Sequence, residues 1–368
     1  MTSTIPNPLA LIAELTHRCP LHCVYCSNPL ELQSRTTELT TEVWSRVFKE
    51  AAEAGVLQAD FTGGEPLARP DIVELVCAAR SPGLYVNLIT SGLPLDEAKL
   101  AALVDAGLDH IQLSFQGARE DTANEISGTK SHAQKLRVLE WLRQHGIAVT
   151  LNFVIHRRNV DELEQMLAIA ESSCATRIEF ANVQYYGWAF ANRENLLPTR
   201  EQLNRSVEFL KRGGLLPDFV QAAVPHVFEC EAGNHLRGVA GKSIAAWRDQ
   251  HQLAAPAAHA GLGVLRVIVR NDKFDADFAL QSFLFAFQKF RGEAWMQEPC
   301  KTCDRRELDF GGCRCQAWLL AGDAAATDPV CSLSPIHPKV DAILTGINAA
   351  PPAQLFVKPA WLYRPNPA

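Results

Sequence analysis

The sequence predicts an α/β fold built on a parallel sheet, followed by a small cysteine-rich domain. Two observations lead to this prediction: short apolar runs alternate with helical periodicity from residue 10 to about residue 213, and most cysteines gather in two distant groups. Six successive β/α units favour a parallel sheet, either doubly wound or curled into an open barrel. Because the chemistry of such barrels gathers at the carboxyl ends of the strands, functional motifs should follow predicted strands.

Each predicted strand is a short run of apolar residues. We expect strands at Leu9–Leu15, Leu57–Thr62, Leu84–Thr90, His110–Phe115, Ile147–Val154 and Arg177–Gln184. Helical periodicity predicts helices near residues 41–54, 70–80, 94–106, 132–145, 160–172 and 199–212. The expected domains are a barrel over 5–216, an atypical connecting segment over 217–286, a cysteine-rich domain over 287–345 and a Pro-rich tail over 346–368.

Composition favours a cytoplasmic protein. The chain has 368 residues and a formal net charge of -6, which gives no general attraction to nucleic acid or to an anionic membrane. No signal-peptide pattern opens the sequence, and no window holds 18 uninterrupted apolar residues. Of the eleven cysteines, three lie within 19–26 and five within 300–331. In a reducing compartment, such groups indicate metal ligands, whereas the isolated Cys77 and Cys174 are expected to be small buried hydrophobic residues.

The first cysteine group follows the first predicted strand and reads Cys19-Pro-Leu-His-Cys23-Val-Tyr-Cys26. Its spacing allows one loop to wrap three thiolates around a [4Fe-4S] cluster. One iron then stays open for the amino and carboxylate groups of S-adenosylmethionine (SAM). The alternatives are cysteines that merely pack, or a zinc site completed by His17 or His22. Zinc loops usually pair cysteines as CxxC with a second such pair nearby, so the pattern favours the cluster.

CxxxCxxC with Tyr25 before the last cysteine resembles the signature of the radical SAM superfamily. Gly63-Gly64-Glu65-Pro66, after the second predicted strand, resembles its GGEP motif, whose backbone contacts the SAM amino group. The resemblance implies a partial (β/α)6 TIM-like barrel, and cleavage of SAM to a 5′-deoxyadenosyl radical by one electron from an external donor. Further SAM contacts are expected at later strand ends, from Ser91, Ser114, Asn152 and, near the adenine, Val154. Taken singly, these are ordinary strand-end residues or a simple turn.

The second cysteine group resembles the SPASM extension of peptide-modifying radical SAM enzymes. Cys300 and Cys303 form a CxxC pair, Cys313 and Cys315 form a CxC pair, and Cys331 follows a loop. Asp309 stands where the extension has a third cysteine, and a carboxylate can also ligate iron. One auxiliary cluster is therefore expected on Cys300, Cys303, Asp309 and Cys331, and Cys313 and Cys315 would serve a second. The alternative is a zinc ribbon.

Asp309 and its flanking segments narrow the resemblance to the peptide cyclase family of pyrroloquinoline quinone (PQQ) biosynthesis, over about residues 1–215 and 287–340. This family implies a carbon–carbon bond between a glutamate and a tyrosine of the PqqA precursor peptide, which the carrier PqqD presents. Alternatives are another SPASM peptide modifier, such as a sulfatase maturase or a thioether-forming enzyme, and a non-catalytic, metal-stabilised peptide-binding scaffold.

No catalytic base is assigned, although His110 and His156 are candidates. Tyr185, Tyr186 and Trp188 are expected to line a substrate cavity or to pack against the second domain.

The connecting segment departs from the family pattern, because the family supplies two more auxiliary-cluster cysteines there and this chain has only Cys230. A translated frameshift is one hypothesis: Asp249-Gln-His-Gln, encoded GAT-CAG-CAT-CAA, reads Ile-Ser-Ile one base over. If these residues are genuine, the second auxiliary cluster lacks ligands.

Overall fold

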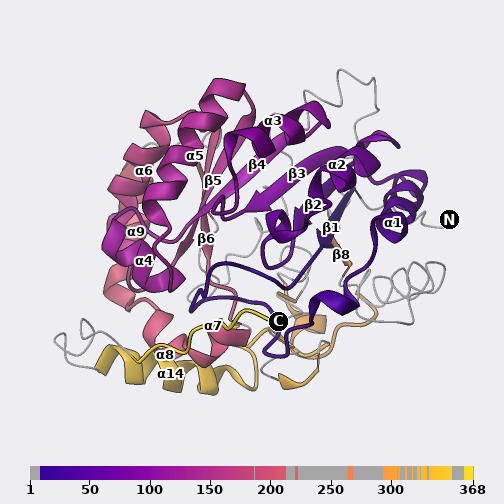
Figure 1. The fold of residues 1–368 in the computed structure, drawn as a ribbon. Coiled ribbons are helices and arrows are strands. Elements are labelled where there is room, and N and C mark those ends of the chain that lie inside the picture. The colour runs from indigo at the N-terminus through magenta and orange to yellow at the C-terminus, as the bar shows by residue number, and fades with distance from the viewer. Residues whose placement is uncertain are drawn as a thin grey trace.

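The computed structural model describes residues 9–185, 187–212, 220–222, 264–267, 293–304, 306, 311–312, 317, 321–323, 325–329, 331–349 and 360–367. Its centre is one parallel sheet, in which the first six strands lie side by side in sequence order and helices cover the outer face (Figure 1). Each of these strands pairs in parallel with the next. The sheet is curved and open, which resolves the choice left by the sequence in favour of a partial barrel.

The six predicted strands are all present, with small shifts at their ends. They are β1 Ala10–Glu14, β2 Gln58–Thr62, β3 Tyr85–Thr90, β4 His110–Phe115, β5 Ala148–Ile155 and β6 Arg177–Asn182. Two further short strands extend the sheet at its two edges: β7 Val220–Ala222 beside β6, and β8 Val264–Val267 beside β1. Both come from the connecting segment, in which no strand was predicted. Their pairing partners lie far away in the sequence, so no local sequence pattern predicts these two strands.

The six predicted helical segments are also present, namely α1 Thr41–Glu53, α2 Ile72–Arg80, α3 Glu97–Asp105, α5 His132–His145, α6 Leu163–Ser172 and α9 Arg200–Arg212. The sequence analysis missed α4 Glu120–Ser127, α7 Gly187–Ala191, α8 Arg193–Leu196 and α14 His337–Ala349. Short 3-10 turns occur at η1 Arg35–Thr37, η2 Pro66–Ala68, η3 Val160–Glu162 and η4 Cys300–Thr302. Among the described residues, no helix is both long and apolar enough to cross a membrane.

The two faces of the sheet differ in polarity. Toward the helices, alternate residues form the main hydrophobic core, in which the rings of Phe115 and Phe153 stack at 5.4 Å. On the other face, the residues in between are largely polar. Asp60, Asn87 and His110 are cross-strand neighbours there, and Ser114 lies opposite Asn152. This alternation follows from the two-residue period of a strand.

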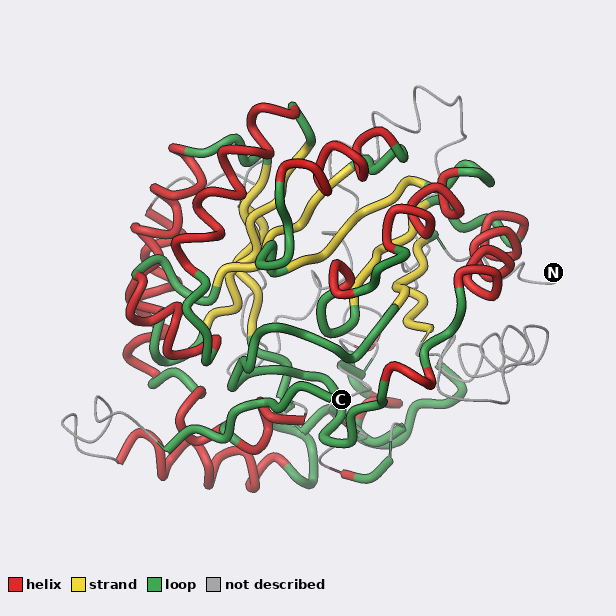
Figure 2. The backbone as a smooth tube through the Cα atoms, viewed as in Figure 1, coloured by secondary structure: helices red, strands yellow, loops and turns green. Residues whose placement is uncertain are grey.

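The loops that follow the strands gather at one edge of the sheet, where the C-terminal residues also run (Figures 1 and 2). The cysteine loop leaves β1 toward this edge. The functional motifs therefore meet where barrel chemistry is expected.

Candidate functional site

The first cysteine loop is held along its backbone by the end of α4. The N–H of His22 donates to Ser127 O at 2.8 Å, and the N–H of Val24 donates to Ile126 O at 3.1 Å. Between the cysteines, Val24 is fully buried in a small hydrophobic cluster with Ile126, Val183, Ala189 and Leu196. The centre of the loop is therefore anchored in a small hydrophobic core of its own.

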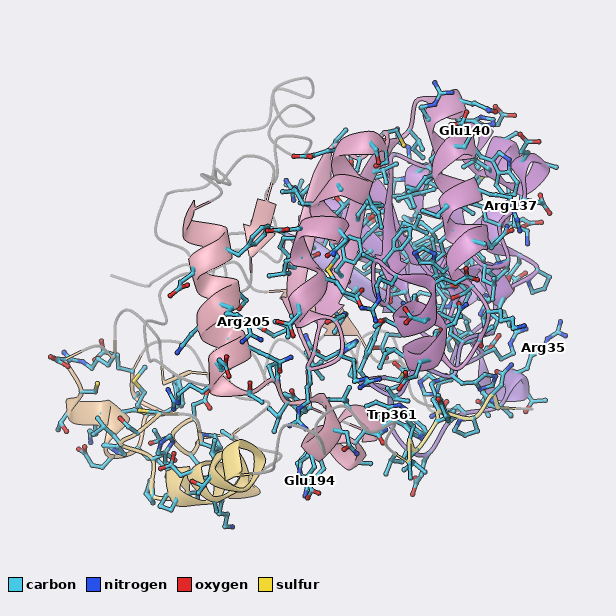
Figure 3. The ribbon with its side chains drawn as sticks, turned by 90° about the vertical axis from the view of Figure 1, so that its left-hand side faces the viewer. Arg35, Arg137, Glu140, Glu194, Arg205 and Trp361 are labelled. Atoms are coloured by element: carbon cyan, nitrogen blue, oxygen red, sulfur yellow. The ribbon has the colours of Figure 1, made fainter. Side chains whose placement is uncertain are left out.

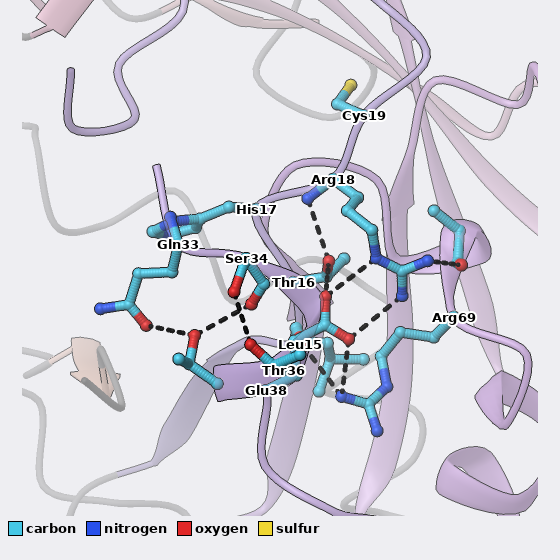
Figure 4. A network of polar contacts seen from close by, with 12 residues as sticks. Leu15, Thr16, His17, Arg18, Cys19, Gln33, Ser34, Thr36, Glu38 and Arg69 are labelled. Carbon is cyan, nitrogen blue, oxygen red and sulfur yellow. Dashed lines mark hydrogen bonds and ion pairs between the residues drawn. The ribbon is translucent and has the colours of Figure 1, made fainter. Parts of the chain in front are cut away.

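A network of charged groups fixes the entry to the loop (Figure 4). The Arg18 guanidinium donates to both oxygens of Glu38, at 3.0 and 3.1 Å, and the Thr16 hydroxyl also donates to Glu38. Arg69, which is 5% exposed, donates to the Leu15 carbonyl and forms an ion pair with Glu38 at 3.7 Å. Bidentate contacts of this kind are geometrically specific as well as strong. The backbone that enters the loop is thus fixed from three sides.

The two glycines of the GGEP motif allow the motif to lie against the cysteine loop. The Gly64 N–H donates to Thr16 O at 2.6 Å, and the Glu65 N–H donates to Arg18 O at 2.7 Å. A Cβ atom at Gly63 would collide with Thr16 O, and one at Gly64 would collide with Arg18 O. Gly63 also has a φ of 135°, which other residues rarely adopt. Both positions require glycine because two backbone segments touch there.

The Glu65 carboxylate joins the ends of β2 and β3. It is fully buried and accepts hydrogen bonds from the N–H of Leu67 at 3.0 Å and the hydroxyl of Thr90 at 2.7 Å. The N–H and the hydroxyl of Ser91 donate to its other oxygen, at 2.8 and 2.5 Å. Ser91 and Glu65, both expected to contact SAM, therefore bind each other and position the GGEP turn.

A buried lysine that the sequence analysis missed lies beside the cysteines. Lys135, on α5, is 1% exposed, and its ammonium donates to Ser114 O and to Gln116 Oε1, both at 2.6 Å. The Gln116 amide in turn donates to the Tyr25 hydroxyl at 3.0 Å. Burial lowers the pKa of Lys135 to about 8, and the nearby Cys23, Glu65 and Cys19 act in the opposite direction. Lys135 is the one charged residue on the buried face of α5, a signal that was readable in the sequence.

The remaining predicted SAM contacts lie on β4 and β5. Ser114 is the cross-strand neighbour of Asn152. The Asn152 side chain forms a hydrogen bond that lowers the pKa of Glu179, against the larger effect of burial, which raises it. Val154 is partly buried against the small cluster around Val24. These residues share the end of the sheet at which Tyr25 lies.

The donor set of the three cysteines fits an iron–sulfur cluster. Burial raises the pKa of Cys19 to about 12, and burial likewise raises the pKa values of Cys23 and Cys26. The thiols are therefore protonated at neutral pH, and iron would have to displace their protons. The Nε atom of Arg364 and the Nδ2 atom of Asn28 are buried without a hydrogen-bond partner in the described part of the chain. Donors of this kind suit cluster sulfur atoms.

The two histidines that could complete a zinc site both have backbone partners. His17 Nδ1 accepts the Gln33 N–H at 3.0 Å, and His22 Nδ1 lies 2.7 Å from Arg364 O. The Nδ1 atom of each histidine thus contacts a backbone group near the cysteine loop.

The second cysteine group is brought together in part. Cys300, Cys303 and Cys331 line one pocket, with Gly311 and Gly312 in its wall. The Gly312 position tolerates no side chain, because a Cβ atom there would strike Asp328. Asp309, Cys313 and Cys315 lie outside the described residues. Three of the four ligands expected for one auxiliary cluster therefore share a pocket.

Other expected residues have different surroundings. Burial lowers the pKa of His110 to about 4 and that of His156 to about 3, so both are neutral and weakly basic at neutral pH. Trp188 is 4% exposed and packs near Arg364. Tyr185 packs against the small hydrophobic cluster around Val24, and Tyr186 lies outside the described residues.

The prediction for one isolated cysteine was wrong. Cys77 is exposed, because α2 buries Ile72, Leu75, Val76 and Ala79 and turns position 77 outward. Cys174 is partly buried.

Known proteins resemble both the fold and the sequence. Residues 13–170 match the model of the Radical SAM superfamily. The PqqA peptide cyclase of Gluconobacter oxydans (strain 621H) is 46% identical over 366 residues, which cover 96% of this chain and 99% of that protein. The PqqA peptide cyclase of Ruegeria pomeroyi (strain ATCC 700808 / DSM 15171 / DSS-3) is 47% identical over 357 residues, covering 93% and 91%.

Solved structures support the fold. SuiB of Streptococcus suis bound to the precursor peptide SuiA aligns with a TM-score of 0.65, at 16% identity, over 89% of this chain and 76% of that one. Native anSMEcpe with bound AdoMet and the Cp18Cys peptide aligns with a TM-score of 0.59, at 17% identity, over 92% and 96%. These likenesses concern the barrel architecture, whereas the sequence identity to the cyclases extends over nearly their whole length. The chain therefore belongs to the PqqA peptide cyclase family of radical SAM enzymes.

Proposed function

We propose that this radical SAM enzyme joins a glutamate side chain to a tyrosine ring in the PqqA precursor peptide, an early step of PQQ biosynthesis. The identity of 46% to a PqqA peptide cyclase over 99% of that protein carries the proposal. The site geometry is in keeping with it, because three cysteines, the GGEP turn and polar strand ends meet at one edge of the barrel.

Cys19, Cys23 and Cys26 would hold the [4Fe-4S] cluster, and the residues around it would hold SAM. When bound, the cluster supplies the electron that cleaves SAM to methionine and a 5′-deoxyadenosyl radical, which removes hydrogen from the peptide. Gly63 and Gly64 expose backbone beside the cysteine loop, and Tyr25, Ser114, Asn152 and Val154 surround the same end of the sheet. Ser91 and Glu65 would act on SAM indirectly, because their hydrogen bonds hold the turn that carries the two glycines.

Lys135 is proposed to attract the carboxylate of SAM. Its ammonium is buried and has only neutral oxygens as hydrogen-bond partners, Ser114 O and Gln116 Oε1. A buried cation is costly unless anions face it, and the carboxylate of a ligand would add a direct anionic partner to the influence of the nearby Glu65. Lys135→Met should therefore weaken SAM binding about 10- to 100-fold, the usual loss for one buried charged contact. Lys130→Met is the control, because Lys130 lies outside this network. Equal SAM affinity in both variants would remove Lys135 from the site.

The crosslink removes two hydrogens from the peptide. One leaves as an atom to the deoxyadenosyl radical, and the ring proton and one electron leave after the carbon–carbon bond has formed. We propose that Cys300, Cys303, Asp309 and Cys331 would hold an auxiliary iron–sulfur cluster, which would supply an acceptor for this electron, and that Cys313 and Cys315 would serve a second cluster. The shared pocket of Cys300, Cys303 and Cys331 supports the first of these assignments.

The proposed partners are the carrier PqqD, which presents the peptide, and an external electron donor. We also propose a cytoplasmic location, where clustered thiols stay reduced and available to iron. Nucleic acid and membrane are not expected as partners.

The function is tested with the anaerobically reconstituted enzyme, a low-potential reductant, SAM, PqqA and PqqD. We expect 5′-deoxyadenosine together with a peptide that is two hydrogens lighter and carries a Glu–Tyr crosslink in tandem mass spectra. A thioether or a formylglycine product would establish a different SPASM chemistry. The absence of 5′-deoxyadenosine under conditions in which the cluster is present would favour the non-catalytic scaffold.

The connecting segment 217–286 is proposed to carry a translated frameshift near Asp249. The support is its lack of the two cysteines that the family pattern has there, since it contains only Cys230. Sequencing the encoding DNA decides the matter, because an unbroken and correct reading frame removes the hypothesis. In that case the enzyme should cleave SAM while making less crosslink, since the second auxiliary cluster would lack ligands.

A further inference from the structure

The last described residues of the chain run back across the cysteine loop. We call residues 361–366 the C-terminal strap. In Figure 1 the C-terminal end of the chain reaches the region between α7 and the cysteine loop, and in Figure 3 Trp361 lies at the same edge of the molecule. The strap belongs to the segment expected to be a Pro-rich tail. Instead, its residues make specific contacts with the proposed radical-generating site.

The strap is bonded to the residues that flank the first two cysteines. Asn366 Oδ1 accepts the N–H of Cys19 itself at 3.2 Å. Arg364 and His22 form a pair of contacts, because the Arg364 N–H donates to His22 O at 3.3 Å and His22 Nδ1 lies 2.7 Å from Arg364 O. The Arg364 guanidinium also donates to His17 O. The cysteine loop is therefore held on this side by a segment more than 330 positions later in the sequence.

The strap is also anchored to the elements that hold the loop from behind. Leu362 and the Asn192 side chain exchange two hydrogen bonds, at 2.8 and 3.0 Å, and Asn192 donates to Val24 O at 2.9 Å. The Trp361 indole donates to Glu125 Oε1 at 2.9 Å. Loop, strap, α4 and the α7–α8 corner thus form one hydrogen-bonded unit.

Arg364 brings an uncompensated positive charge into this unit. The residue is 1% exposed. Its guanidinium forms no ion pair with any carboxylate among the described residues. Its Nε atom is buried without a hydrogen-bond partner in the described part of the chain. Its hydrogen bonds to His17 O and His22 O place it beside the residues that flank Cys19 and Cys23. A buried cation is costly unless an anion faces it, and the nearby thiolates of a bound cluster are such anions.

We propose that the C-terminal strap is part of the radical-generating site: it clamps the cysteine loop in its ligating conformation, and Arg364 offsets the negative charge of the cluster-bound thiolates. This inference rests on the proposed cluster at Cys19, Cys23 and Cys26. Reduction adds one negative charge to the cluster, so a buried cation nearby stabilises the reduced form and raises its reduction potential. Arg364 is a positioning residue in this account.

The test compares full-length Arg364→Gln, Arg364→Lys and Asn366→Ala with the wild type after anaerobic reconstitution. Arg137→Gln is the matched control, since it removes the same charge from the exposed face of α5. Two properties are measured: the midpoint potential of the cluster whose electron paramagnetic resonance signal changes on addition of SAM, and the rate of iron loss to a chelator. The response to SAM selects the cluster with an open iron and excludes the auxiliary sites.

We expect Arg364→Gln to have a more negative midpoint potential and to lose iron about 10- to 100-fold faster, as is usual when support around a metal site is removed. Arg364→Lys should keep the wild-type potential because it keeps the charge, and Asn366→Ala should lose iron faster at an unchanged potential. Arg137→Gln should match the wild type.

Wild-type values in Arg364→Gln would overturn the proposal, as would equal potentials in Arg364→Gln and Arg364→Lys that both lie below the wild type. If Arg364→Gln does not fold, as judged by circular dichroism, Asn366→Ala decides: faster iron loss supports the proposal, and the wild-type rate of iron loss overturns it. A wild-type protein that takes up no SAM-responsive cluster would instead refute the proposed cluster site.

Discussion

The two cysteine groups differ in what holds them. The loop with Cys19, Cys23 and Cys26 is bonded to α4, to the GGEP turn, to the α7–α8 corner and to the C-terminal strap, so its contacts come from four distant parts of the sequence. For the second group, the following contacts lie within the cysteine-rich segment itself. Cys300 lies 3.4 Å from the Thr327 hydroxyl, and the Cys331 N–H donates to Asp328 O at 2.9 Å.

The two sites therefore differ in how much their shape depends on the rest of the fold. The first loop is part of the barrel, and hydrogen bonds from distant segments hold its backbone. The second lies in a segment too short to build a large core, and segments of this kind use metal ligation as folding energy. Variants of each group and removal of the metal test that contrast.

Removing one thiol of the first loop should abolish SAM cleavage. In Cys23→Ala, an iron of the cluster would lose its protein ligand, while the fold and the iron at the second group should persist. The measurements are 5′-deoxyadenosine formation and iron content per chain. Cys77→Ala is the control, because Cys77 is exposed on α2. Full SAM cleavage by Cys23→Ala would refute the assignment of the first loop.

Metal removal should loosen the second group selectively. In metal-free protein, protease cleavage within 293–349 should be at least about tenfold faster than in the iron-loaded protein, because the metal contributes folding free energy there. The barrel, 9–212, should keep its resistance in both forms. Timed digestion with peptide mapping gives both rates. Equal protection of 293–349 with and without metal would end the proposed contrast, and uptake of zinc alone after reconstitution would favour the zinc ribbon.

Removing the Glu65 carboxylate should destabilise the barrel edge that supports the first loop. Glu65→Ala leaves the donors of Leu67, Thr90 and Ser91 without their acceptor in a buried site, which should lower the free energy of unfolding by about 3 kcal/mol. Urea denaturation measures this loss. Glu53→Ala, at an exposed position on α1, should change stability by less than about 0.5 kcal/mol. Similar values for both variants would contradict the structural role of Glu65.

The polar face of the sheet should make stability depend on pH away from either cysteine group. Both ring nitrogens of His110 have hydrogen-bond partners. Nδ1 lies 2.7 Å from Asn87 Oδ1, and Nε2 lies 3.0 Å from Thr150 Oγ1. Burial lowers its pKa from 6.5 to about 4. A lowered histidine pKa means that the unfolded chain binds the proton more tightly, so this contribution is complete above pH 6.5 and is lost as the pH falls toward 4.

His110→Asn should remove this part of the pH dependence, which amounts to at most about 3 kcal/mol. Unfolding free energies measured between pH 7 and pH 4 compare the variant with the wild type. An unchanged slope in His110→Asn would show that other groups produce the dependence. His145→Asn, at an exposed position on α5, is the control.

The sequence predicted the local features of this protein well. Six strands, six helical segments, the cysteine loop and the GGEP turn could all be predicted, because each depends on the period of neighbouring side chains or on a short motif. Helical periodicity also indicates the environments of two residues that were not predicted correctly. It places Lys135 on the buried face of α5 and Cys77 on the exposed face of α2.

Tertiary structure alone decided how distant residues complete the first site. No local pattern pairs β8 with β1, joins Ser91 to Glu65, or brings Arg364 and Asn366 back to Cys19 and His22. These contacts form because the folded chain must satisfy buried backbone groups and a buried charge with whatever segments lie nearby. Residue types and spacing thus determined which cofactor the loop suits, and the fold determined what holds that loop in place.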